Sequence, residues 1–144
     1  MENNSIMNEQ LCLRIGNSLS ELDRLLMEVE CFLVRCAVAG REAYHIQLAL
    51  DELVTNVISY AYDSENGHVI DVMLTHNPGS VEMTLQDEGR PFNPLMAPEP
   101  DVNIPVQRRR IGGLGIHFVR KTMDELVYER KNGKNILHIR KKTT

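Results

Sequence analysis

A glutamate and an asparagine stand four residues apart in the segment 52–56. On a helix, this spacing places Glu52 and Asn56 on one face. A carboxylate can accept a proton from a nucleophile, and a neutral amide oxygen can ligate a hard cation such as magnesium. Taken alone, a solvated polar stripe explains the two residues more simply. A helix that lines a cleft is favoured by the apolar residues on both sides of the stripe, namely Leu53, Val54, Val57 and Ile58.

A second acidic residue stands at the end of an alternating strand. Asp87 continues the apolar face formed by Val81, Met83 and Leu85, because side chains in a strand alternate with a period of two. A carboxylate on an apolar face requires a hydrogen-bond donor. An adenine amino group would supply one, and Gly89 would let a flat ring approach the backbone. A simple turn after the strand explains the same residues.

A glycine-rich run and a group of arginines lie close together. The run is Gly112-Gly113-Leu114-Gly115, and it is preceded by Arg108, Arg109 and Arg110. Backbone amides before a helix can cradle a phosphate, and guanidinium groups match phosphate oxygens. A hinge and a solvated basic loop are the plainer interpretations. The run fits neither the Walker A pattern nor the dinucleotide fingerprint.

Periodicity predicts the elements that must position these residues. Alternation predicts strands over residues 10–15, 68–75, 80–86, 126–130 and 135–141. Helical spacing predicts helices from a capping box at Ser18 and Glu21 to about residue 36, over 41–62 and over 116–122.

Turn signals separate these elements. Gly40 fits the left-handed end of the first helix. Asn132-Gly133 suits a tight turn with positive backbone angles. Repeated prolines make residues 90–111 a long loop. The order of elements predicts an α+β fold, with helices on one face of a mostly antiparallel sheet.

The composition is that of an ordinary globular protein. The 144 residues suit one domain, expected over 9–141 after a polar tail at 1–8. The net charge of −4 gives no sign of nucleic-acid binding. Cys12, Cys31 and Cys36 lack metal-ligand spacing and are expected to be small core residues in a reducing cytosol. No signal segment or membrane-length apolar run is evident, so we expect a cytoplasmic protein.

Taken in order, the three polar segments resemble the N, G1 and G2 boxes of the GHKL ATPase superfamily. The resemblance covers about residues 9–141, and the stretch GGLGIHFVRKTMDE (112–125) looks most like the anti-sigma regulatory serine kinase branch. It implies a Bergerat, histidine-kinase-like fold, a two-layer α/β sandwich with a mixed, mostly antiparallel sheet. ATP would lie between the helices and the sheet, beneath a mobile lid.

The resemblance also assigns roles to residues. Glu52 would be the catalytic base, and Asn56 would ligate Mg2+. Asp87 would bind the adenine amino group, and Gly89 would leave space beside the ring. The run Gly112-Gly113-Leu114-Gly115 would bind the phosphates, with the amides of Gly113 and Gly115 as the cradle. One of Arg108, Arg109 and Arg110 would neutralise charge on the γ-phosphate.

The function that the resemblance implies is an ATP-dependent serine-protein kinase and anti-sigma regulatory factor. It would phosphorylate an anti-anti-sigma (STAS-type) partner, which competes with a sigma factor, and the family often forms homodimers. Three alternatives stay open, and the plainest is an α+β domain whose matches to the three boxes are accidental. A nucleotide-binding partner-switch module without efficient transfer would have no need of Glu52. A sensor histidine kinase fragment is disfavoured because the first predicted helix lacks a phosphoacceptor histidine.

Overall fold

A computed structural model describes residues 9–63, 67–96 and 115–144. The elements occur in the order β1 (Glu9–Gly16), α1 (Leu19–Arg35), α2 (Gly40–Tyr60), β2 (Val69–Asn77), β3 (Ser80–Asp87), the 3-10 helix η1 (Pro94–Met96), α3 (Gly115–Thr122), β4 (Glu125–Lys131) and β5 (Lys134–Lys142). Each predicted strand and helix is present, with ends that differ by a few residues. Within the predicted loop, η1 is an additional element.

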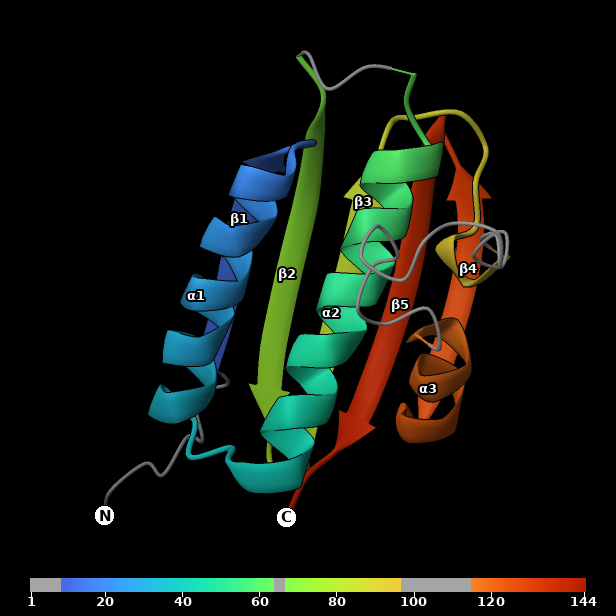
Figure 1. Cartoon of the computed structure of the whole chain (residues 1–144). Helices are drawn as coiled ribbons and strands as arrows, with labels where there is room; N and C mark the ends of the chain where they lie inside the picture. Colours follow the sequence, from blue (N-terminus) through green and yellow to red (C-terminus); the bar gives the residue numbers. More distant parts are fainter. Residues whose placement is uncertain (1–8, 64–66, 97–114) are drawn as a thin grey trace, which may run out of the picture.

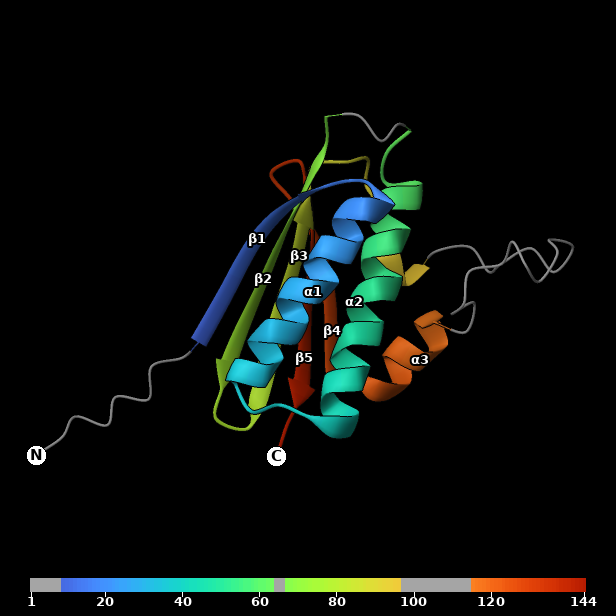
Figure 2. The same cartoon turned by 60° about the vertical axis from the view of Figure 1, so that its left-hand side comes forward.

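The strands form one sheet with the order β1-β2-β3-β5-β4. All four neighbouring pairs are antiparallel. The helices α1, α2 and α3 lie on the same face of this sheet, and no helix of the described residues covers the other face (Figures 1 and 2). The predicted α+β fold with helices on one face is therefore confirmed, and every pairing in the described sheet is antiparallel.

The core lies between the helices and the sheet. Fully buried residues recur at helical spacing in α1 and α2 and at alternate positions in the strands, including Leu25, Phe32, Ile46, Leu50, Ile70, Leu74 and Met83. Each such side chain contributes roughly 1.5–3 kcal/mol when it leaves water. This packing fixes α2, which carries Glu52 and Asn56, above the middle of the sheet (Figure 1).

The start of α1 follows its sequence signal in part. The Ser18 hydroxyl accepts a hydrogen bond from the Glu21 backbone N–H at 3.3 Å. The Glu21 carboxylate instead accepts from the Gly16 N–H at 3.0 Å. The pair therefore satisfies free amides as predicted, but Glu21 ties α1 to the end of β1.

The predicted end of the first helix at Gly40 is wrong. The helix ends at Arg35 with Cys36 as its C-cap, and the left-handed residue that follows is Ala37, with φ of 56°. Val38 N–H then donates to the Leu33 carbonyl, which gives the bonding of a left-handed helix end. Gly40 also has positive φ, at 62°, but it begins α2.

Other expectations meet mixed outcomes. Asn132 and Gly133 have φ of 53° and 75°, as the tight turn between β4 and β5 requires. All three cysteines are free, but Cys12 and Cys31 are exposed, so their predicted place in the core is wrong. Among the described residues, no helix is long and apolar enough to cross a membrane.

Candidate functional site

The polar stripe of α2 is buried. Every residue from 52 to 58 is buried, so Glu52, Thr55 and Asn56 are enclosed with their apolar neighbours. Glu52 is 5% exposed and Asn56 is 9% exposed. The interpretation as a solvated stripe is therefore wrong. A carboxylate and an amide held in a protein interior have restricted geometry, which suits chemistry better than solubility.

Glu52 lies against the first residue of α3. A Cβ atom added to Gly115 would come within 2.0 Å of the Glu52 carboxyl carbon and of Oε2. Only glycine leaves room for the carboxylate at this position. The structure thus brings together two residues 63 positions apart that the sequence assigned to different boxes.

Asn56 faces η1. Its side-chain nitrogen Nδ2 donates to the Pro94 carbonyl oxygen at 3.0 Å. A second hydrogen bond holds η1, because Arg120 of α3 donates to the Leu95 carbonyl at 3.3 Å. The Asn56 amide is therefore oriented by its nitrogen, so that its oxygen Oδ1 is the atom available as a ligand.

Asp87 is buried on the helix-facing side of β3, as alternation predicts, and is 5% exposed. Its Oδ1 accepts two hydrogen bonds, from the Gly89 N–H at 2.8 Å and from the Asn135 side-chain nitrogen at 3.0 Å. The predicted need for a donor is thus met within the chain. Neither of these two donors uses Oδ2.

Asn135 is a site residue that our sequence analysis missed. It is 2% exposed and precedes Leu137 and Ile139 on the apolar face of β5. A polar residue that continues an apolar face is the signal that singled out Asp87, and it would have found Asn135 as well. The two residues are register partners across β3 and β5.

Gly89 makes a close backbone approach. A Cβ there would lie 2.5 Å from the Ala61 carbonyl oxygen and 2.9 Å from Asp87 Oδ1. The next residue, Arg90, donates its N–H to the same Ala61 carbonyl at 3.1 Å. The backbone at the C-terminal end of α2 therefore requires a glycine at position 89, whether or not a ligand lies beside it.

Tyr62 borders the Asp87 carboxylate. Its hydroxyl oxygen accepts a hydrogen bond from the Glu88 N–H at 3.1 Å, and its ring stacks on His68 with centroids 4.3 Å apart. Burial, followed by the nearby charge of Asp87, raises the pKa of Tyr62 to about 12. The phenol therefore stays neutral at physiological pH and adds no charge beside the carboxylate.

These contacts define two ends of one site along α2. We call Asp87, Gly89 and Asn135 the Asp87 end, and Glu52 with Gly115 the Glu52 end. Ala61, which touches Gly89, lies nine residues after Glu52, a separation of about 14 Å along a helix. Asn56 lies between Glu52 and Ala61 on α2, so it stands between the two ends of the site.

Several predicted residues lie outside the described part of the chain. They are Arg108, Arg109, Arg110, Gly112, Gly113 and Leu114. Gly115 is the member of the glycine-rich run that the structure describes. Their predicted contacts with phosphate stay predictions.

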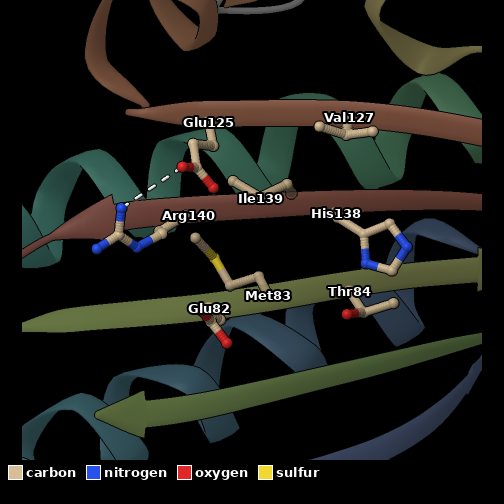
Figure 3. Close-up of a pocket in the computed structure, with 8 residues that line it drawn as sticks. All are labelled: Glu82, Met83, Thr84, Glu125, Val127, His138, Ile139 and Arg140. Atoms are coloured by element: carbon tan, nitrogen blue, oxygen red, sulfur yellow. Dashed lines mark ion pairs between the residues drawn. The ribbon is translucent and has the colours of Figure 1, made fainter.

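The open face of the sheet holds a separate hollow (Figure 3). It is lined by Glu82, Met83, Thr84, Glu125, Val127, His138, Ile139 and Arg140. Arg140 and Glu125 pair across it at 3.6 Å. The hollow includes none of the predicted site residues, and it lies on the face of the sheet opposite the helices. We therefore place the candidate site beneath the helices rather than here.

Comparisons with known proteins identify a family and related sequences. The histidine kinase-like ATPase domain family matches residues 15–141. The chain is 26% identical over 99 residues to the serine/threonine-protein kinase BtrW of Bordetella bronchiseptica, covering 69% of this chain and 70% of that protein. It is 28% identical over 109 residues to the anti-sigma F factor of Priestia megaterium, covering 70% of this chain and 69% of that protein.

Solved structures share the fold. A Mycobacterium tuberculosis protein containing RsbU and RsbW domains gives a TM-score of 0.65 at 13% identity, covering 94% of this chain and 32% of that one. The present chain thus spans about a third of that longer chain. The SiaB-SiaC complex of Pseudomonas aeruginosa gives a TM-score of 0.56 at 16% identity, covering 92% and 89%.

Proposed function

Because the chain belongs to the family of histidine kinase-like ATPase domains, we propose that it is an ATP-dependent serine-protein kinase and anti-sigma regulatory factor. Its substrate is a serine on an anti-anti-sigma (STAS-type) partner, and phosphorylation of that serine controls the release of a sigma factor. The names of two relatives, a serine/threonine-protein kinase and an anti-sigma factor, support both parts of this proposal.

The contact between Glu52 and Gly115 carries the proposal. Binding of a nucleotide does not by itself require a buried carboxylate beside Gly115, because a carboxylate and the phosphates of the nucleotide repel each other. A base that takes the proton of an incoming hydroxyl does require one. The missing side chain of Gly115 leaves the room that the Glu52 carboxylate occupies, which favours a carboxylate that must stay in place.

The transfer step follows from these positions. The serine hydroxyl gives its proton to Glu52 while its oxygen bonds to the γ-phosphorus of ATP. The bond from that phosphorus to the β-phosphate oxygen breaks, and ADP leaves. Catalysis of this kind depends mostly on positioning and electrostatic stabilisation, which buried residues on packed elements can supply.

The remaining residues bind and orient the substrate. Asp87 accepts a hydrogen bond from the adenine amino group, and Gly115 contributes a backbone amide to the phosphates at the start of α3. The Asn56 amide fits a magnesium ion, because its nitrogen is held by Pro94 and its oxygen is a suitable hard ligand. When bound, Mg2+ neutralises phosphate charge.

The test is phosphoryl transfer with purified components. The chain is mixed with γ-labelled ATP, Mg2+ and a candidate STAS-type partner, and label on the partner is followed over time. Wild type is expected to label the partner, and a partner whose serine is replaced by alanine is expected to stay unlabelled. Glu52→Gln is expected to bind ATP and to lower the transfer rate by about 100-fold or more, within the range for general-base catalysis.

Asp51→Asn is the matched control. It removes a carboxylate from the neighbouring position of α2 and is expected to keep transfer near wild type. Equal transfer by wild type and Glu52→Gln would contradict the role of the base. ATP binding with partner capture but no transfer would favour the alternative, a partner-switch module that sequesters a regulatory protein without efficient phosphoryl transfer.

A further inference from the structure

Asn135 uses both atoms of its side-chain amide at the Asp87 end. Its nitrogen Nδ2 donates to Asp87 Oδ1 at 3.0 Å and to the Arg90 carbonyl at 2.8 Å. Both donor hydrogens of the amide are therefore used, one on the carboxylate and one on the loop that follows β3. A single buried residue thus links the carboxylate to the backbone beyond it.

The amide oxygen of Asn135 accepts from the other side. Its donors are the Tyr128 hydroxyl at 2.6 Å, the Phe92 N–H at 3.0 Å and the Arg130 guanidinium at 3.1 Å. The same nitrogen of Arg130 also donates to the Gly89 carbonyl at 2.8 Å. Residues of β4, at the edge of the sheet, are in this way connected to the loop beside Asp87.

This pattern fixes which way the amide points. Rotating the amide by half a turn would set its nitrogen against three donors and its oxygen against two acceptors. Because Asn135 is 2% exposed, water cannot readily replace the lost partners, and unsatisfied buried groups are costly. The direction of Nδ2 toward Asp87 is therefore strongly preferred.

We propose that Asn135 is a positioning residue for recognition of the adenine amino group. It holds one oxygen of Asp87, together with the Gly89 N–H, so that the carboxylate presents its other oxygen Oδ2 in a fixed direction. Asn135 acts through Asp87 and needs no contact with the nucleotide. This inference rests on the proposed function, since it concerns how the same site selects its nucleotide.

The test compares ATP with purine riboside triphosphate, which lacks the 6-amino group. Asn135→Leu keeps a similar volume but removes the amide. We expect it to weaken ATP binding by about tenfold, the scale of losing a hydrogen bond at a charged group. Binding of the analogue should change little, so the preference for ATP falls toward that of Asp87→Ala. Calorimetry of each nucleotide with each variant measures this preference.

A double-mutant cycle separates positioning from general damage. In the Asp87→Ala background, Asn135→Leu should weaken ATP binding no further, because residues that act as a unit are not additive. Leu137→Ala is the matched control. It lies on the same face of β5 and is 2% exposed, so it should lower the melting temperature while keeping the preference for ATP.

Each outcome decides a different question. If wild type binds neither triphosphate, the proposed function fails and this inference fails with it. If wild type prefers ATP and folded Asn135→Leu keeps that preference, only this inference is overturned. If Asn135→Leu does not fold, Tyr128→Phe replaces it, because it removes one donor to the amide oxygen and should reduce the preference to a smaller extent. An unchanged preference in Tyr128→Phe then overturns the inference.

Discussion

At the Asp87 end a carboxylate is held by strand register, whereas at the Glu52 end a carboxylate is held by helix packing. Asp87 and Asn135 face each other because β3 and β5 pair at those positions, and their hydrogen bonds follow from that pairing. Glu52 reaches its place because α2 and α3 come together at Gly115. The first arrangement depends on the backbone ladder, and the second on a missing side chain.

This difference suggests a division of labour. A ladder of backbone hydrogen bonds is rigid, which suits recognition of a base that never reacts. A contact between two helices depends on side-chain packing, so the position of Glu52 depends on the space that Gly115 leaves. Both ends rely on a glycine, but the atoms that crowd each glycine differ in how easily they can move.

The strongest test of this comparison is Gly115→Ala. The added Cβ would occupy the place of the Glu52 carboxylate, at 2.0 Å from its carbon. Because those atoms end a flexible side chain, the carboxylate should rotate away and the fold should survive. We expect transfer to the partner to fall by about 100-fold, as misplacement by about 1 Å can cause, with little change in melting temperature.

Single-turnover transfer and thermal unfolding check this prediction together. Gly16→Ala is the control, because a Cβ at Gly16 would meet its nearest atom at an ordinary 3.5 Å. Normal transfer by Gly115→Ala would show that the Glu52 carboxylate has no fixed position to lose.

Gly89→Ala should have the opposite profile. Its Cβ would lie 2.5 Å from the backbone oxygen of Ala61, and a helix end cannot rotate away as a side chain can. We expect a loss of about 1–3 kcal/mol in the free energy of unfolding, as for other overpacked positions. Chemical denaturation measures this loss. A stability equal to that of Gly16→Ala would remove the distinction between the two glycines.

The sequence was a good guide to elements and to faces. Alternation placed Asp87 on the buried face of its strand, and helical spacing placed Glu52 and Asn56 together, because both periods are local properties of the backbone. The end of α1 was misplaced because Ala37 adopts a left-handed conformation that usually favours glycine.

The spacing of residues within a segment does not predict contacts between residues that are far apart in the sequence. The approach of Gly115 to Glu52 depends on how two helices pack, and the link from Asn135 to Asp87 depends on strand register. Neither is encoded in the spacing of residues along one segment. Asn135 could have been suspected from its place on an apolar face, but its partner could not.

The smallest expected effect concerns pH at the Asp87 end. The pKa of Tyr62 is raised from 10.0 to about 12 by burial and by the charge of Asp87. A raised pKa means that the fold favours the neutral phenol, so this contribution to stability is fully present below pH 10 and is lost as the pH rises toward 12. In Tyr62→Phe the phenol is absent, and the fall in melting temperature across this alkaline range should be shallower than in wild type. Thermal unfolding of both proteins at a series of pH values checks the difference. Parallel curves throughout would mean that folding does not favour the neutral phenol, and thus that burial beside Asp87 does not raise the pKa of Tyr62.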